Sequence, residues 1–159
     1  LAKYRPMKTH ENILLFAKKP GGTYNPIMEK GEPFKRQSKN PEGYVSKRND
    51  HGYGLKPVKG FENKGTRYPK SVLNISRDFS AQQQVHPTQK PVPVLEWLIK
   101  TYSNENDIVL DHCMGSGSTG VAARKLHRRF IGIDNEEKYL KIAKDRIEEI
   151  PLDIFSIIG

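Results

Sequence analysis

The sequence predicts an α/β protein whose central feature is a pair of parallel strands. Two short apolar runs, residues 108–110 and 130–133, are each followed by a carboxylate, Asp111 and Asp134. The first run continues through closely spaced glycines into a stretch of helix-forming residues, which leads to the second run. A strand, a glycine-rich turn, a helix and a second strand together form half of a mononucleotide-binding unit.

The helices and strands of this unit follow from the spacing of apolar residues. Residues 91–103 predict an amphipathic helix, because their apolar positions recur on one helical face. Residues 104–107 predict a turn, and 108–111 the first strand. Residues 118–127 and 136–149 predict two further helices, the last ended by Pro151. We expect the strand at 129–133 to lie beside that at 108–111, parallel to it and joined by a right-handed crossover.

The glycine-rich turn indicates which kind of ligand the unit binds. Gly115, Gly117 and Gly120 match the dinucleotide pattern G-x-G-x-x-G, which by itself is also found in ordinary structural turns. Asp111 precedes the first glycine, where its charge would repel a pyrophosphate but would attract an ammonium group. A carboxylate such as Asp134, at the tip of the second strand, commonly binds ribose hydroxyls. The pattern therefore favours a cationic nucleoside over a dinucleotide.

Two linked motifs resemble one family of enzymes. Residues 111–120 (DHCMGSGSTG) are similar to the cofactor motif of S-adenosylmethionine-dependent DNA amino-methyltransferases, which usually reads Asp-Pro-Phe-x-Gly-Ser-Gly-Thr-Thr. Residues 86–91 (HPTQKP) resemble the element that precedes this motif in the permuted β group of the family. Residues 131–134, followed by Tyr139, Ala143 and Arg146, are similar to its second strand and next helix. The resemblance is dense over residues 86–150.

The resemblance implies S-adenosylmethionine as cofactor and a Rossmann-like methyltransferase sheet. It places Asp111 near the ammonium group, Gly115 to Gly117 beneath it and Asp134 on the ribose, while Thr88 or Lys90 reaches the carboxylate of the methionine end. His-Pro and Lys-Pro pairs are also ordinary ways to start a helix, so this loop has two interpretations. The predicted cofactor-binding residues are His86, Thr88, Lys90, Asp111, Cys113, Gly115, Ser116, Gly117, Thr119 and Asp134.

The catalytic tetrapeptide of the family, Asp/Asn/Ser-Pro-Pro-Tyr/Phe, does not occur in this sequence. In the β group it lies toward the N-terminus, so we expect this chain to be the C-terminal half of such an enzyme, with an incomplete sheet. Residues 12–17, after Thr9, His10 and Glu11, resemble the strand that closes the catalytic half. We assign no catalytic residue. The expected divisions are 1–17 (end strand of the catalytic half), 18–85 (target-recognition insert), 86–150 (cofactor-binding portion) and 151–159 (tail).

The predicted insert carries the excess charge. Residues 18–90 contain fifteen Lys or Arg and six Asp or Glu, which accounts for the whole net charge of +9. Prolines, glycines and single aromatics interrupt this stretch, so an irregular, basic, DNA-facing segment is predicted. A solvated linker would have the same composition. The densest basic group, and the predicted DNA contact, is Lys35, Arg36, Lys39, Lys47 and Arg48.

The cysteine, the histidines and the hydropathy of the sequence limit which kinds of site and location are expected. Cys113 is the single cysteine, which we expect to be a buried packing residue in a reducing cytoplasm, and the five histidines lack metal-ligand spacing. We find no apolar stretch of transmembrane length.

The predicted function is methyl transfer to the exocyclic amine of adenine or cytosine in double-stranded DNA, as part of restriction-modification. A second chain or a missing N-terminal half would supply the catalytic motif. The alternatives are a noncatalytic DNA-binding remnant or split subunit, and a nicotinamide-binding oxidoreductase fragment.

Overall fold

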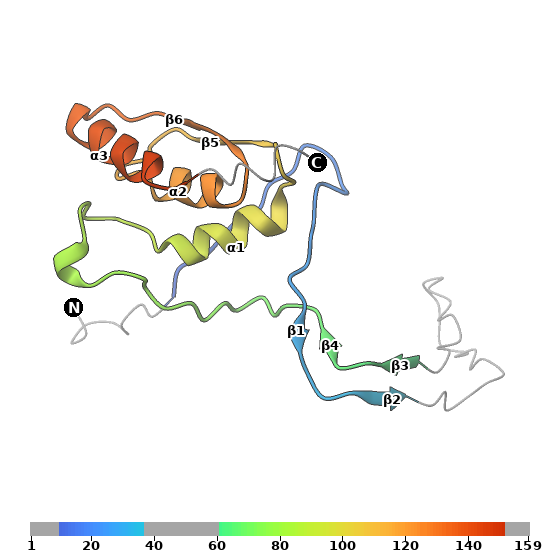
Figure 1. Cartoon of the computed structure of the whole chain (residues 1–159). Coiled ribbons are helices and arrows are strands. Elements are labelled where there is room, and N and C mark those ends of the chain that lie inside the picture. The colour runs from blue at the N-terminus through green and yellow to red at the C-terminus, as the bar shows by residue number, and fades with distance from the viewer. Residues whose placement is uncertain (1–9, 37–60, 152–159) are drawn as a thin grey trace, which may run out of the picture.

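A computed structural model describes residues 10–36 and 61–151 (Figure 1). An α/β unit and a narrow two-stranded arm make up most of it. In chain order the elements are β1 (Glu29–Lys30), β2 (Phe34–Arg36), β3 (Phe61–Asn63), β4 (Thr66–Arg67), a 3-10 turn (Ala81–Gln83), α1 (Val92–Tyr102), β5 (Ile108–Asp111), α2 (Ser118–Lys125), β6 (Arg129–Gly132) and α3 (Glu137–Glu148).

The predicted parallel pair is confirmed. β5 and β6 are hydrogen-bonded in parallel, with a register that runs from Ile108↔Arg129 to Asp111↔Gly132. The helix between them, α2, contains Ala122 and Ala123, both fully buried, and these small residues let α1 pack closely against α2. Val92 and Ile99 of α1 join them in the hydrophobic core. The α/β class and the narrow sheet therefore agree with the sequence prediction.

The two faces of this short sheet differ. Because successive side chains of a strand point to opposite faces, Val109 and Phe130 pack against the helical core while their neighbours point away. Figure 1 shows α2 and α3 on one side of β5 and β6. On the other side Ile108, Leu110 and Ile131 are 49–60% exposed. One face of the parallel sheet is thus buried and the other remains largely open.

The N-terminal segment runs along α1 and is fixed at both ends. Near the start of α1, the Lys90 ammonium contacts the Glu11 carboxylate at 2.6 Å. At the other end, the backbone N–H of Asn25 donates to the carbonyl of Thr101 at 2.7 Å, and its side-chain amide donates to the carbonyl of Ser103 at 3.1 Å. The last carbonyls of a helix have no partner within the helix. Asn25 therefore caps α1 from a distant part of the sequence.

The strand expected at residues 12–17 does not form within the described ranges. These residues belong to no ladder of the described structure, and Ile13, Leu14, Leu15 and Phe16 are 53–85% exposed. A strand is stabilised by its neighbour, and this segment borders a cavity instead of another strand. The apolar composition of residues 12–17 is typical of a strand, but no described strand pairs with them.

The structure adds two short ladders to the segment that the sequence predicts to be irregular. β1 pairs with β4, and β2 with β3, both antiparallel, so that the two ladders form an arm that extends from the α/β unit in Figure 1. The rings of Phe34 and Phe61 meet edge to face across β2 and β3, with centroids 5.5 Å apart. Within the described ranges, no helix is long and apolar enough to cross a membrane.

Candidate functional site

The glycine-rich turn between β5 and α2 is buried and closely packed. Gly115 and Gly117 have φ angles of +50° and +75°, in the left-handed region that favours glycine. A Cβ atom added to Gly117 would lie 2.7 Å from the Cβ of Ala143, so α3 packs directly against the backbone of the turn. Residues 115–118 are all buried. The turn is thus a buried, closely packed loop at the carboxyl end of β5.

Asp111 holds the start of this loop. Its carboxylate accepts a hydrogen bond from the backbone N–H of Cys113 at 3.1 Å and from the Thr119 hydroxyl at 2.6 Å. Cys113 is exposed, which corrects the expectation that it packs in the interior. The neighbouring Met114 packs inward instead, because its sulfur occupies the space that a Cβ atom on Gly132 would need.

Asp134 links the second strand to the same loop. Its carboxylate accepts the backbone N–H of Gly115 at 2.7 Å and that of Glu136 at 3.0 Å. The N–H groups of Glu136 and Gly115 lower the pKa of Asp134, and the nearby His86 ring contributes to the same shift. The carboxylate therefore remains ionised at neutral pH.

The two carboxylates lie at one edge of the sheet. Asp111 is the last residue of β5, and its carbonyl accepts the backbone N–H of Ile133, the residue before Asp134, at 2.9 Å. A carboxylate group offers about four lone-pair sites. Two hydrogen bonds to each carboxylate leave sites for the hydroxyl or ammonium donors of a ligand. The edge therefore suits a ligand rich in donors and carrying positive charge.

Two side chains of the loop at 86–90 lie in different places, His86 at the glycine loop and Lys90 at the N-terminal segment. The imidazole of His86 packs against the Tyr139 ring, with centroids 4.4 Å apart, and a Cβ atom on Gly115 would lie 3.2 Å from its Nε2. Its Nδ1 accepts the backbone N–H of Thr88 at 3.2 Å, and the Thr88 hydroxyl lies at the same distance. His86 thus lies on the glycine loop, whereas the Lys90 ammonium is paired with Glu11.

Arg146 supports the loop from α3, although the sequence suggested no role for its side chain beyond the resemblance. The half-buried guanidinium donates to the carbonyl of Ser116 and lies 3.5 Å from the Ser118 hydroxyl. Burial lowers the pKa of Arg146, while Asp78 and Glu149 oppose that shift. The overlooked signal is its position three residues after Ala143, which places a cation on the packed face of α3.

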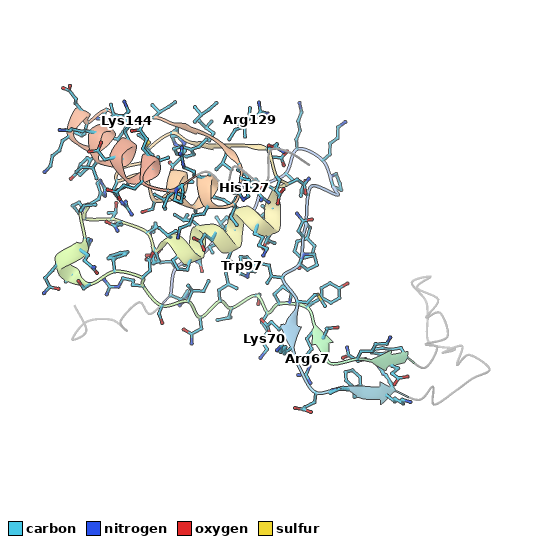
Figure 2. The ribbon with its side chains drawn as sticks, viewed as in Figure 1. Arg67, Lys70, Trp97, His127, Arg129 and Lys144 are labelled. Atoms are coloured by element: carbon cyan, nitrogen blue, oxygen red, sulfur yellow. The ribbon has the colours of Figure 1, made fainter. Side chains whose placement is uncertain are left out.

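The predicted DNA-contacting residues lie away from this loop. Lys35 and Arg36 are exposed on β2 of the arm, and the Lys35 ammonium lies 3.3 Å from the Glu62 carboxylate. Lys39, Lys47 and Arg48 lie outside the described residues. Figure 2 shows Arg67 and Lys70 near the base of the arm, far from the labelled Lys144 on α3. Across residues 10–36 and 61–151, no three His, Cys, Asp or Glu side chains are grouped to hold a metal ion.

Comparisons with known proteins place this architecture in a family. The chain is 56% identical over 64 residues to the type II methyltransferase M2.LlaDCHI of Lactococcus lactis subsp. cremoris, a match that covers 40% of this chain and 24% of that protein. It is 57% identical over 63 residues to the type II methyltransferase M2.DpnII of Streptococcus pneumoniae, with the same coverage of 40% and 24%. The matches thus span about a quarter of the length of these relatives.

Among solved structures, the chain resembles the crystal structure of the M1.HpyAVI–SAM complex, with 30% identity and a TM-score of 0.44, covering 76% of this chain and 63% of that one. A family profile described as DNA methylase, of the N6/N4 type, matches residues 1–145, which is more than nine-tenths of the sequence. The chain therefore belongs to the N6/N4-type DNA methylase family.

Proposed function

We propose that this chain supplies the S-adenosylmethionine-binding part of a site-specific DNA methyltransferase that modifies the exocyclic amine of adenine or cytosine. One observation carries the proposal: Asp111 and Asp134 lie at the same edge of β5 and β6, joined through the glycine loop. A family likeness supports it. The residues that accept the base and polarise its amine belong to the tetrapeptide that this sequence does not contain.

The residues at this edge fit the proposed cofactor. S-adenosylmethionine carries an ammonium, a sulfonium and ribose hydroxyls, and it supplies an electrophilic methyl group. Asp134, held ionised by two backbone N–H groups, is suited to accept ribose hydroxyls. Asp111, held by Cys113 and Thr119, places a second negative charge toward the cationic end. Gly115 brings the backbone close to the ligand, with the His86 ring beside it.

Calorimetric titration with S-adenosylmethionine tests the cofactor role of Asp134. Asp134→Asn keeps an acceptor oxygen but removes the charge, and a hydrogen bond to a charged group contributes about 1.5–3 kcal/mol. We expect roughly tenfold to hundredfold weaker binding. The matched control is Asp107→Asn at the opposite end of β5, where the carboxylate accepts the N–H of Asn104 at 2.8 Å. Equal affinity of both variants would refute the role of Asp134.

We further propose that the arm contacts double-stranded DNA. Its described strands carry Lys35, Arg36 and Arg67 on an exposed two-stranded ribbon, and Phe34 and Phe61 are half-exposed beside them. Cations next to aromatic rings suit phosphate contact combined with packing on sugars or bases. We also propose that the chain acts in a reducing cytoplasm, with which the free thiol of Cys113 is compatible.

Salt dependence of duplex binding tests the arm. The affinity for duplex DNA falls as salt rises, so the slope of log affinity against log salt is negative. Replacing Lys35 and Arg36 by Ala should make this slope less steep by about 0.9 for each phosphate group that the variant no longer neutralises. The control replaces Lys138 and Lys141, two exposed lysines near the start of α3, and should leave the slope unchanged. If both double variants have the wild-type slope, these two arm residues do not contact phosphate.

A further inference from the structure

The segment that joins the 3-10 turn to α1 turns three of its side chains inward. Within residues 81–90, Gln84, His86 and Gln89 are half-buried and the other residues are exposed. Figure 1 shows this segment leading from the 3-10 turn into α1, and the contact of His86 with Tyr139 brings it onto α3. A glutamine that leaves water loses the hydrogen bonds of its amide unless the protein replaces them. The partners of the two glutamines therefore matter.

The side chain of Gln84 acts as a donor. Its Nε2 donates to the carbonyl of His86 at 2.9 Å and to the carbonyl of Pro87 at 2.8 Å. Two carbonyl partners require the NH₂ end of the amide, so these contacts fix its orientation. The carbonyl of His86 also accepts the backbone N–H of Gln89 at 3.0 Å, which closes a turn over residues 86–89. Both lone pairs of that carbonyl are thus used.

The side chain of Gln89 acts as an acceptor. Its Oε1 accepts the backbone N–H of Val85 at 3.0 Å. Gln89 therefore holds the backbone just before His86, and Gln84 holds it just after. Pro87 has no backbone N–H, which removes one donor from the middle of the segment. The two side-chain amides supply bonds that a helix or a strand would otherwise provide.

These bonds determine where the ring of His86 points. Its Nδ1 accepts the backbone N–H of Thr88 at 3.2 Å, so the neutral ring carries its proton on Nε2. That Nε2 lies 3.2 Å from the position of a Cβ atom added to Gly115. The backbone N–H of Gly115 is in turn bound by the Asp134 carboxylate at 2.7 Å. His86 thus directs an N–H group at the residue that Asp134 holds.

We propose that Gln84 and Gln89 are positioning residues for cofactor binding, which hold the Nε2–H of His86 toward the glycine loop. The inference rests on the proposed function, because that function assigns the glycine loop to S-adenosylmethionine. Both amides are engaged within their own segment, so they act through His86. A segment that is ordered before the ligand arrives does not lose that conformational freedom on binding, and the affinity is higher for it.

Glutamate substitutions separate the donor from the acceptor, since a carboxylate has acceptor oxygens but no NH₂ group. At neutral pH, Gln89→Glu still accepts the N–H of Val85, whereas Gln84→Glu turns a carboxylate toward two carbonyls. Calorimetric titration of the whole chain with S-adenosylmethionine should show binding weakened about tenfold or more by Gln84→Glu. Gln89→Glu should retain most of the affinity. Equal affinity of the two variants would overturn the inference.

Methionine substitutions remove each amide without adding charge and keep a side chain of similar length. Gln84→Met and Gln89→Met should each weaken binding about threefold to tenfold. The matched control is Gln83→Met, because the Oε1 of Gln83 accepts the N–H of Ser80 at 2.9 Å within the 3-10 turn. This control should leave the affinity unchanged. A loss of the same size in Gln83→Met would contradict a specific role of the other two glutamines.

Nitrogen-15 NMR of labelled histidine observes the ring itself, with the signal of His86 identified by its loss in His86→Phe. The proton should lie on Nε2 in the unaltered chain and in Gln89→Glu, and both tautomers should be populated in Gln84→Met. If Gln84→Met lowers the melting temperature but keeps the original tautomer, the glutamines only stabilise the fold and the inference is wrong.

The same titrations distinguish this inference from the proposed function. An unaltered chain that does not bind S-adenosylmethionine would overturn both. An unaltered chain that binds it, together with Gln84→Glu and Gln84→Met variants of unchanged affinity, would overturn the inference alone.

Discussion

The carboxyl end and the free edge of β5 belong to the same strand but are completed in different ways. At the carboxyl end, residues 115–118 are buried, and Asp111, Asp134 and Arg146 connect the loop to its surroundings. At the free edge, Ile108 is 53% exposed and borders a cavity. The hydrogen-bond partners of the loop lie within residues 86–150, whereas the cavity at the edge of β5 is also lined by residues 13–15 and 69–73. The carboxyl end of β5 is thus completed by contacts from nearby sequence, and its free edge faces distant parts of the chain.

The largest expected effect lies in the loop. Gly117→Ala would place a methyl group against Ala143 at a positive φ angle, so it combines overpacking of about 1–3 kcal/mol with a left-handed penalty of about 1–2 kcal/mol. Urea denaturation should show a decrease in unfolding free energy of about 2–5 kcal/mol.

The matched control for this change is Gly21→Ala. Gly21 also has a positive φ angle, +85°, but no atom lies within 4 Å of the added Cβ. This variant should show only the left-handed penalty of about 1–2 kcal/mol or less. If the two alanine variants are destabilised equally, α3 does not approach the backbone of the loop closely enough to exclude a side chain at position 117.

A smaller effect is expected from Arg146. Arg146→Met retains the apolar stem but leaves the buried carbonyl of Ser116 without its donor, which costs about 1–3 kcal/mol. Arg146→Lys should recover part of this stability. The control is Lys144→Met on the same helix, whose side chain is 72% exposed, with an expected change within about 0.5 kcal/mol (Figure 2). Thermal melting curves that coincide for Arg146→Met and Lys144→Met would exclude a supporting role.

The smallest effect is expected in the arm. Phe61→Ala removes the edge-to-face packing on Phe34, which contributes about 0.5–1.5 kcal/mol beyond burial. We expect faster hydrogen exchange in β2 with no change in the melting of the α/β unit. Tyr68→Ala, at a 69% exposed position just after β4, serves as the control. A drop in the melting temperature of the α/β unit with Phe61→Ala would show that the arm and the unit fold together.

The α/β unit was predictable because its signals are local. Apolar periodicity predicts a helix at 91–103, and the structure has α1 at Val92–Tyr102; the same reasoning gives β5, α2, β6 and α3 within about two residues. Asp111, Gly115 and Asp134 come together because strand ends of a parallel pair share an edge. These are consequences of spacing within about thirty residues of sequence.

Features that depend on distant pairing could not be predicted in this way. β1 pairs with β4, so Glu29 meets Arg67 across a long connection that leaves no periodic signal in either segment. The failure of residues 12–17 to form a strand has the same origin, since pairing requires a neighbour that composition cannot supply. The hydrogen bond from Arg146 to Ser116 joins residues 30 apart, and only the packing of α3 against the loop reveals it.

The cap that Asn25 places on α1 has a consequence for the order of folding. Its bonds to Thr101 and Ser103 close a loop of more than seventy residues, whereas β5, α2 and β6 assemble from contacts near in sequence. Closing a long loop costs entropy that only later contacts repay, so the nucleus should form in the α/β unit and the N-terminal segment should dock afterwards. Asn25→Ala should then accelerate unfolding while leaving the refolding rate nearly unchanged. The N-terminal segment, which lines the cavity, would thus dock after the α/β unit has folded.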